Sequence, residues 1–328
     1  MSHQFHHRDL SELRFLITGG AGFIGSNLVE YLVRHGAGKI RILDNLLTGY
    51  RSNIEPFLSL PNVEFMEADI RDYNTCLSAC EGIDYVSHQA ALGSVPRSVK
   101  DPLATHSINA TGFLNMLTAA KEKSVKRFVY ASSSSVYGDH PVLPKREAET
   151  GNPLSPYAVS KKTNELYASV FGMTYGIEVI GLRYFNVFGP NQSPDGPYAA
   201  VIPLFMLAAL QKSSPFIDGD GEQTRDFTYV ENAVQANIRA FFANHPEAVN
   251  QVYNIAVGER LTINSLYTMI AGLAGSEVAS THRATRAGDI RDSLADISKA
   301  ERLLEYHPTV KAKAGLEKTL TWFIKNHR

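Results

Sequence analysis

Tyr157 and Lys161 stand four residues apart in the stretch Leu154-Ser155-Pro156-Tyr157-Ala158-Val159-Ser160-Lys161, so on a helix they share one face. A phenol is a poor base near neutral pH, because its unperturbed pKa is about 10. A lysine ammonium nearby favours the phenolate. Such a tyrosine can accept a proton from a substrate hydroxyl while a hydride leaves the same carbon. An ordinary surface helix can carry the same pair, so its surroundings must decide.

A run of serines supplies hydroxyl groups near this pair. Ser132 to Ser135 follow the segment 127–131, which reads as a buried strand. Hydroxyls at the carboxyl end of a strand can bond to a sugar oxygen and share its proton. A polar turn after a strand has the same composition, so the run alone is open to both interpretations.

Three glycines at a spacing of three, Gly19, Gly22 and Gly25, follow an apolar run and precede an amphipathic segment at 27–34. Strand, glycine turn and helix in this order place a pyrophosphate at the helix N-terminus, where free N–H groups and the helix dipole favour an anion. The glycines permit a tight turn, close approach of the phosphates, and close packing of helix on strand. A flexible turn is the alternative interpretation of the triplet.

Asp44 strengthens the dinucleotide interpretation. It ends the second apolar run, 39–43, about twenty residues past Gly25. A carboxylate there is placed for the adenosine ribose hydroxyls and would repel a 2′-phosphate, which favours NAD over NADP. The alternative is a solvated carboxylate at a strand end.

The elements that must position these residues alternate through the first half of the chain. We expect strands at 14–18, 39–44, 63–68, 85–89, 127–132 and 178–183, and helices at 22–34, 72–80, 102–123 and 156–175. This alternation predicts an α/β fold with a doubly wound parallel sheet covered by helices on both faces.

The pattern changes after residue 183. Three prolines and two glycines between 189 and 197 indicate a loop, and 218–221 reads as a turn. Helices are expected at 203–211, 231–242, 262–274 and 314–326. These shorter elements suit a smaller α/β lobe over the carboxyl ends of the strands, where open α/β sheets bind ligands.

Composition narrows the class of partner. The chain has 328 residues with 32 Lys+Arg against 33 Asp+Glu, a net charge of -1, and no basic stripe, which argues against nucleic acid. No apolar run approaches the roughly eighteen residues of a membrane helix, so no membrane partner is expected.

The N-terminal segment and the cysteines indicate the cellular compartment. The segment before Asp9 lacks the regions of a signal peptide, and Cys76 and Cys80 are too few for a disulfide framework, so we expect a cytoplasmic protein with two buried, inert thiols. His3, His6 and His7 could catch a metal, but a disordered tail is the better interpretation. No metal site is predicted.

Together these motifs resemble the extended short-chain dehydrogenase/reductase family. Thr-Gly-x-x-Gly-x-x-Gly, the serine-rich strand end and Tyr-x-x-x-Lys occur in the family's order. The likeness continues in the stretches 88–91, 183–186, 224–227 and 286–289, and covers nearly the whole chain from Arg14 onward. Within the family the chain is most similar to nucleotide-sugar 4-epimerases, in particular the bacterial UDP-N-acetylglucosamine 4-epimerases.

The resemblance implies roles for individual residues. Tyr157 is the base, Lys161 holds the nicotinamide ribose and tunes Tyr157, and Ser133 bonds to the reacting sugar oxygen. The implied NAD site consists of Gly19, Gly22, Phe23, Ile24, Gly25, Asp44, Asn45, Asp69, Ile70, Gln89, Ala90, Ala91, Tyr157, Lys161 and Tyr184.

The implied UDP-sugar site is carried over in the same way. Asn186, Arg225 and Arg286 match positions that hold the diphosphate, a task that guanidinium forks suit, and Phe216 lines the uracil. The full implied set is Gly93, Ser94, Ser133, Ser134, Tyr157, Asn186, Ala200, Val201, Phe216, Arg225, Arg286, Asp289 and Ser293. A surface salt bridge is the alternative for either arginine.

Departures within the family narrow the reaction. The 4,6-dehydratases carry an acidic pair where this chain has Ser134-Ser135, and decarboxylases carry a glutamate nearby. Ser293 stands where epimerases restricted to unacetylated sugars tend to have tyrosine. With the small residues Gly93, Ser94 and Ala200, it implies room for a 2-N-acetyl group, for which Ser134 is a candidate hydrogen-bond partner. Small residues are also common in loops.

The resulting prediction is an NAD-dependent 4-epimerase that interconverts UDP-N-acetylglucosamine and UDP-N-acetylgalactosamine through a 4-keto sugar. UDP-glucose, UDP-galactose and the uronic acid forms stay open as substrates. The alternatives are a nucleotide-sugar dehydratase or decarboxylase and a non-catalytic NAD-binding protein, although a mere binder needs neither Tyr157 nor Lys161.

The resemblance also implies an organisation. It divides the chain into an N-terminal tail at 1–13, a Rossmann-type NAD-binding domain at 14–185 with roughly 226–256, and a nucleotide-sugar lobe at 186–225 and 257–328. It implies a homodimer joined through the helices near 102–123 and 156–175.

Overall fold

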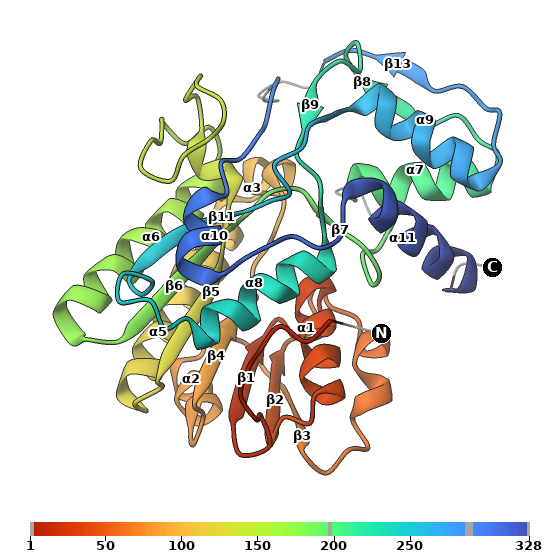
Figure 1. Ribbon diagram of the computed structural model, residues 1–328. Coiled ribbons are helices and arrows are strands. Elements are labelled where there is room, and N and C mark those ends of the chain that lie inside the picture. The colour runs from red at the N-terminus through yellow and green to blue at the C-terminus, as the bar shows by residue number, and fades with distance from the viewer. Residues whose placement is uncertain (1–2, 196–198, 286–290, 327–328) are drawn as a thin grey trace.

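A seven-stranded parallel sheet lies at the centre of the chain in a computed structural model that describes residues 3–195, 199–285 and 291–326 (Figure 1). The strand order is β3-β2-β1-β4-β5-β6-β11, and every neighbouring pair is parallel. The strands are β1 (Arg14–Thr18), β2 (Lys39–Asp44), β3 (Val63–Glu67), β4 (Tyr85–His88), β5 (Arg127–Ser133), β6 (Glu178–Tyr184) and β11 (Gln251–Ile255). The order turns back between β1 and β4, which opens a ligand crevice in sheets of this kind. The predicted fold class is confirmed.

Side chains alternate between the two faces of the sheet, so one strand contributes to two apolar layers. In β1, Phe15 and Ile17 pack into one core and Leu16 into the other. α1 (Phe23–Arg34) and α8 (Val230–Phe242) pack together on the first face, and α10 (Ser298–Leu304) packs against β11. The second face is covered by α2 (Tyr73–Cys80), α5 (Phe113–Glu122) and α6 (Pro156–Tyr175). The sheet is therefore doubly wound, as predicted.

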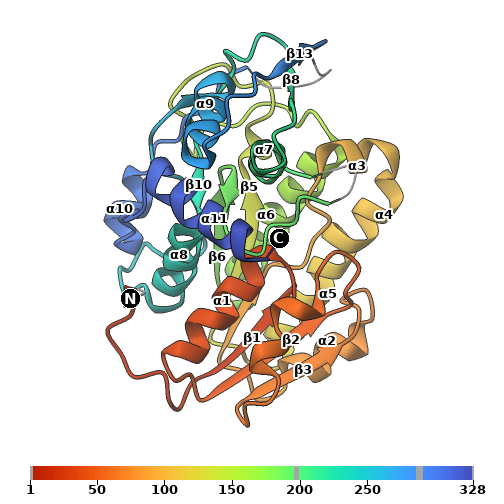
Figure 2. The same ribbon diagram turned by 90° about the vertical axis from the view of Figure 1, so that its right-hand side faces the viewer.

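A second lobe lies at the top of Figure 1 and has a core of its own. It contains α7 (Val201–Leu210), α9 (Ile263–Ala274) and α11 (Ala312–Asn326). Three short strand pairs accompany them: β8 (Phe216–Asp218) with β13 (Thr281–Arg283), β9 (Thr224–Arg225) with β12 (Leu261–Thr262), and β7 (Val187–Phe188) with β10 (Thr228–Tyr229). Turning the molecule by 90° shows α9 and α11 stacked above α1 and the sheet (Figure 2).

The long helix expected at 102–123 is interrupted. α3 (Val95–Lys100) and α4 (Pro102–His106) lead into a single π-helical segment, Ser107–Gly112, before α5 begins. A π bulge of this kind is commonly found at functional sites. Asn109 lies in it and is buried.

The expectation of a disordered N-terminal tail is wrong for residues 3–13. Phe5, His6 and Leu10 are buried, and the Phe5 ring stacks on Tyr31 with centroids 5.5 Å apart. The Tyr31 hydroxyl also lies 2.7 Å from Nδ1 of His6. The apolar residues interleaved with the histidines therefore dock the segment on α1.

Two further expectations concern single features. Cys76 and Cys80 are free and buried in α2, as predicted, and burial raises the pKa of each thiol to about 12. Within the described part of the chain, no helix combines the length and apolarity needed to cross a bilayer.

Candidate active site

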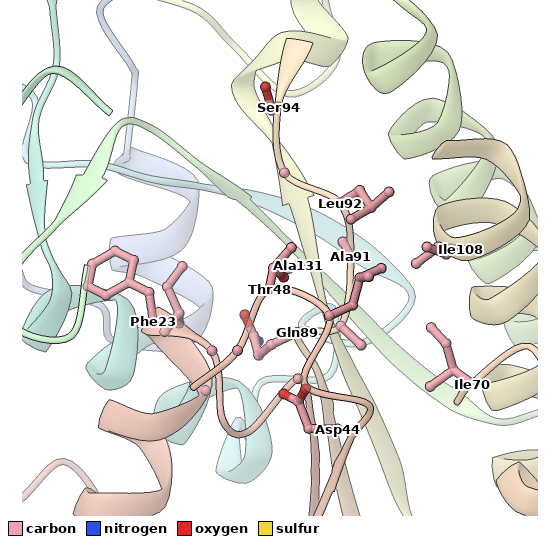
Figure 3. A pocket seen from close by; sticks show the side chains of 18 of the residues that line it. Phe23, Asp44, Thr48, Ile70, Gln89, Ala91, Leu92, Ser94, Ile108 and Ala131 are labelled. Atoms are coloured by element: carbon pink, nitrogen blue, oxygen red, sulfur yellow. The ribbon is translucent and has the colours of Figure 1, made fainter. Parts of the chain in front are cut away.

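A cavity of about 520 Å³ opens at the carboxyl ends of the central strands. All fifteen residues predicted for the NAD site line it, from Gly19 in the glycine turn to Tyr184 at the end of β6. In Figure 3, Phe23 lies on one side of the view and Ile70 and Ile108 on the other, with Gln89 between them and Asp44 below. The sheet reversal between β1 and β4 therefore gathers residues that are far apart in the sequence.

The glycine turn has the geometry of a phosphate cradle. Gly19 has a φ of +65°, and a Cβ there would stand 2.7 Å from the backbone N of Ala90. A Cβ at Gly25 would overlap the carbonyl oxygen of Gly19. Gly22 is the N-cap of α1, and no described side chain caps this helix end. Its first N–H groups are therefore available to an anion.

Asp44 closes the other side of this turn. Its carboxylate accepts hydrogen bonds from the backbone N–H of Ala21 at 3.0 Å and of Leu46 at 2.8 Å. Burial raises the pKa of Asp44, and these backbone hydrogen bonds oppose the rise. The carboxylate lines the cavity where β2 ends, so it braces the turn and presents a negative charge to the cavity.

Further along the cavity, a hydrogen bond joins Asn45 and Asp69. Asn45 Nδ2 donates to Asp69 at 2.8 Å, and Arg71 also donates to this carboxylate. The hydrogen bond from Arg71 is the main cause that lowers the pKa of Asp69 to about 2. Asp69 is thus a fixed anionic acceptor at the end of β3, beside Ile70.

Tyr157 and Lys161 lie on the first turns of α6. Ser155 caps this helix by accepting a hydrogen bond from Ala158 N at 3.1 Å, and Pro156 follows the cap. The Lys161 ammonium donates to the carbonyl oxygen of Ala131 at 2.8 Å and lies 5.9 Å from the centre of the Tyr157 ring. The capped start of α6 therefore holds both side chains in the cavity.

The protonation of this pair is set mainly by burial. Burial raises the pKa of Tyr157, and a hydrogen bond with Ser133 opposes the rise. Burial lowers the pKa of Lys161 to about 8, and the carboxylate of Glu165 opposes that change. Ser133, Tyr157 and Lys161 thus lie together in the cavity at the end of β5.

The residues predicted for the nucleotide-sugar site divide between two cavities. Gly93, Ser94, Ser133, Ser134, Tyr157 and Asn186 line the first. Asn186 also lines a second cavity of about 450 Å³ in the upper lobe, together with Val201, Phe216 and Arg225. The Arg283 guanidinium lies 5.2 Å from the centre of the exposed Phe216 ring.

Two of the described predicted residues, Ala200 and Ser293, lie outside these linings. Ala200 is the N-cap of α7, next to Val201. Ser293 is half-buried, and its backbone N–H donates to the Thr224 carbonyl at 3.1 Å. Arg286 and Asp289 lie outside the described residues.

Comparison with known proteins identifies the family. A model of the NAD-dependent epimerase/dehydratase family matches residues 15–256. The chain belongs to this family. It is therefore an enzyme of the nucleotide-sugar epimerase kind and uses NAD.

Three relatives illustrate the likeness. The UDP-glucose 4-epimerase of Mycolicibacterium smegmatis is 36% identical over 95% of this chain and 98% of its own. A UDP-N-acetylglucosamine 4-epimerase structure from Methanobrevibacter ruminantium, in complex with UDP-N-acetylmuramic acid, is 40% identical with a TM-score of 0.91, covering 96% and 99% of the two chains. The UDP-glucose 4-epimerase of Thermus thermophilus, in complex with NAD, is 34% identical with a TM-score of 0.86, covering 96% and 100%.

This epimerase-family chain has cavity residues that sequence reasoning missed. Arg97 lines the first cavity from α3, and Thr48 and Leu92 line it from loops. Their signal in the sequence was weak, because loop residues and a single arginine in a short helix carry no periodic pattern. The remaining unpredicted members of the lining are Leu43, Leu47, Gly49, Ala68, Ile108, Ala131, Ser132 and Val187.

Asn109 was also missed, and it fixes one wall of the cavity from behind. Its Oδ1 accepts from the backbone N–H of Leu92 at 2.8 Å, while Nδ2 donates to Leu92 O at 3.2 Å and to Ser160 Oγ at 3.1 Å. The π segment thereby ties the loop 90–94 to α6. A break in helical periodicity near residue 109 is not visible in the residue types.

Proposed function

We propose that this protein is a 4-epimerase of UDP-N-acetylglucosamine and UDP-N-acetylgalactosamine. The observation that carries the proposal is the shared cavity, in which the glycine turn and Asp44 face the same space as Tyr157, Lys161 and Ser133. A dinucleotide on the turn would bring its nicotinamide end to the tyrosine. The residues present thus fit the cofactor of the family.

Three side chains have defined tasks in this proposal. Tyr157 takes the proton of the sugar 4-hydroxyl, and it returns a proton to the same oxygen when the 4-keto sugar is reduced. Ser133 donates to the same oxygen and so orients it against Tyr157. Lys161 stabilises the phenolate by its charge and holds the nicotinamide ribose. The glycine turn and Asp44 would hold NAD, which would supply a reversible hydride acceptor for C4 of the sugar.

The second cavity supports a UDP-sugar. It meets the first at Asn186, so a ligand lying across both would place its sugar at Tyr157 and its nucleotide in the upper lobe. Phe216 offers an exposed ring for a base, and Arg225 offers a guanidinium fork for phosphate oxygens.

Small residues support an N-acetylated sugar. Gly93, Ser94 and Ser134 line the first cavity beside Tyr157, and nothing lies within 4 Å of the position that a Cβ would occupy at Gly93. The relative named for UDP-N-acetylglucosamine is 40% identical, against 38%, 36% and 34% for three named for UDP-glucose. Hydroxyls rather than carboxylates at Ser134 and Ser135 argue against dehydration, which needs an acid and a base.

The test uses the purified protein without added cofactor. It is incubated with UDP-N-acetylglucosamine, and the sugar products are resolved by chromatography. We expect UDP-N-acetylgalactosamine to accumulate to an equilibrium mixture that is reached from either side. Parallel incubation with UDP-glucose measures the preference, and a higher kcat/KM for UDP-glucose would overturn the N-acetyl assignment.

We further propose a cytoplasmic homodimer. Two free, buried thiols suit a reducing compartment. An apolar stripe on α6, containing Val159, Leu166, Val170 and Met173, is exposed beside α3 and α4, which pack on the same helix. A second copy would cover that stripe.

A further inference from the structure

Three consecutive residues at the end of β5 each hold one residue of α6. The Ala131 carbonyl accepts from the Lys161 ammonium at 2.8 Å, and Ser133 shares a hydrogen bond with Tyr157. Between them, Ser132 Oγ donates to the carboxylate of Glu165 at 2.6 Å. Tyr157, Lys161 and Glu165 are spaced by four residues, so they form one stripe along the inner face of α6.

Glu165 is held rigidly from a third element. Arg183 of β6 donates from Nε and Nη2 to the two oxygens of the Glu165 carboxylate, each at 2.8 Å. Both side chains are almost fully buried. The guanidinium is held in turn by the Glu147 carbonyl at 3.0 Å and by the Tyr137 ring, whose centre lies 4.9 Å away. Such a bidentate pair fixes the position of the carboxylate.

The structure thus assigns Glu165 as a positioning residue for the Tyr157–Lys161 pair: clasped by Ser132 and Arg183, its carboxylate locks α6 onto the end of β5 and fixes a negative charge one helical turn from Lys161. The inference rests on the proposed function, since it presumes that Lys161 must be cationic to serve Tyr157. Glu165 does not line the cavity, so it acts through Lys161.

Charge supports this assignment. The groups facing Lys161 are Tyr157 and Glu165 on its own helix and His88 of β4; Arg183 of β6, Tyr130 of β5 and Lys162 face Glu165. Burial lowers the pKa of His88 to about 3, so His88 is neutral near pH 7. Glu165 is the charged group that raises the pKa of Lys161, against burial, which lowers it to about 8.

Removing the charge of Glu165 moves the loss of the Lys161 ammonium to lower pH. The ammonium of Lys161 is present below its pKa and lost above it. Removing the Glu165 carboxylate takes away the charge that favours the ammonium and leaves the Arg183 cation unpaired, so both changes lower the pKa of Lys161. Activity that depends on the ammonium then declines at a lower pH.

The test is the Glu165→Gln variant, which keeps the shape and removes the charge. Lysine isotopically labelled at Cε reports the titration by NMR, and the Lys161 signal is assigned by its loss in Lys161→Arg. We expect the midpoint for Lys161 to fall by about one pH unit or more. The alkaline limb of the kcat/KM profile should move to lower pH by a similar amount.

Glu178→Gln is the matched control. Glu178 also pairs with a sheet arginine, Arg127, at 2.7 Å, but at the opposite end of β5 and β6. Glu178 is 45% exposed and Glu165 only 6%, so Glu178→Gln should cost less stability. It should leave the Lys161 midpoint unchanged, whereas Glu165→Gln should lower that midpoint.

An unpaired Arg183 in the interior could unfold the single variant, because breaking one side of a buried pair is costly. The double variant Glu165→Gln/Arg183→Met removes both charges and should restore thermal stability while the Lys161 midpoint stays below that of the wild type. An unchanged midpoint in the folded variants overturns the inference. The NMR titration needs no turnover, so it stands apart from the product assay: absence of epimerase activity in the wild type would overturn the proposed function instead.

Discussion

At the scale of single residues, a few side chains decide the chemistry and the fold supplies their environment. As a free side chain, Tyr157 would be an ordinary phenol. In the fold it is buried, with Ser133 and Lys161 beside it. Asp44 is an ordinary carboxylate until the glycine turn donates to it. The spacing of these residues was readable in the sequence, and all of them meet in one cavity. Their protonation was not readable, because it depends on desolvation by residues remote in the chain.

Tyr157→Phe tests the assignment of the base. The variant keeps the ring that packs near Lys161 and loses only the hydroxyl. We expect kcat to fall on the order of a hundredfold or more, the scale of general acid–base catalysis, with little change in affinity for the UDP-sugar. Steady-state kinetics measure kcat, and calorimetric titration of the variant with the UDP-sugar measures the affinity. Near-normal turnover would place the base elsewhere.

Asp44→Ala tests the cofactor site. The wild-type protein should purify with NAD bound, and the variant should lose most of it, because both the turn and the ribose lose their acceptor. Affinity for NAD should fall about tenfold or more, equivalent to about 1.4 kcal/mol. Nicotinamide released by denaturation is assayed per protomer.

Glu67→Ala is the control for that experiment. Glu67 is the register partner of Asp44 on β3, its side chain is 58% exposed, and it does not line the cavity. Its loss should leave the NAD content unchanged. Equal NAD loss in both variants would mean that Asp44 has no special part in holding the cofactor.

At the scale of elements, the periodicity of apolar residues predicted the long, regular helices and strands. The first six strands and α1, α2, α6, α8 and α9 occur within a few residues of their expected bounds. β11, α3 and α10 were missed as elements, since they are short and have no clear alternation or start signal. The π segment at 107–112 and the docked N-terminal residues were also missed. Both depend on tertiary contacts, Asn109 with Leu92 and Phe5 with Tyr31.

Gly25→Ala tests the junction of the glycine turn with α1. The added Cβ would overlap backbone atoms of Gly19 and Gly20, which have no flexible end that could move aside. We expect the free energy of unfolding to fall by about 1–3 kcal/mol and NAD retention to be lost. Urea denaturation and the nicotinamide assay measure both.

Gly272→Ala provides the opposite expectation on the same fold. Gly272 lies inside α9, and no atom stands within 4 Å of its Cβ position. Alanine should stabilise this helix by up to about 1 kcal/mol, with NAD retained. If Gly25→Ala behaves like Gly272→Ala, the turn tolerates a side chain and the argument for close packing is wrong.

At the scale of the whole molecule, the cavities of the two lobes share a lining residue, and apolar side chains of α6 are exposed in the described chain. The two cavities meet at Asn186, in the chain segment that leaves β6 for the upper lobe. On the other side of α6 from Tyr157 and Lys161, the stripe of Val159, Leu166, Val170 and Met173 faces outward. Helix α6 therefore serves the active site with one face and, by our proposal, a second protomer with the other.

The last prediction concerns that outward face. Leu103 on α4 is 82% exposed and Met173 on α6 is 75% exposed, which is unusual for apolar residues on two helices of one surface. Replacing both by lysine should raise the dissociation constant of the homodimer more than tenfold, because two ammonium groups would have to be desolvated in an apolar contact. Sedimentation velocity over a range of protein concentrations measures it. Val142→Lys is the control, because Val142 is 51% exposed but lies in a loop rather than on α4 or α6. The described cavity linings come from a single chain, so the monomeric double variant should keep its NAD. A wild type that is monomeric at all concentrations, or a double variant that stays dimeric, would show that this face has another use.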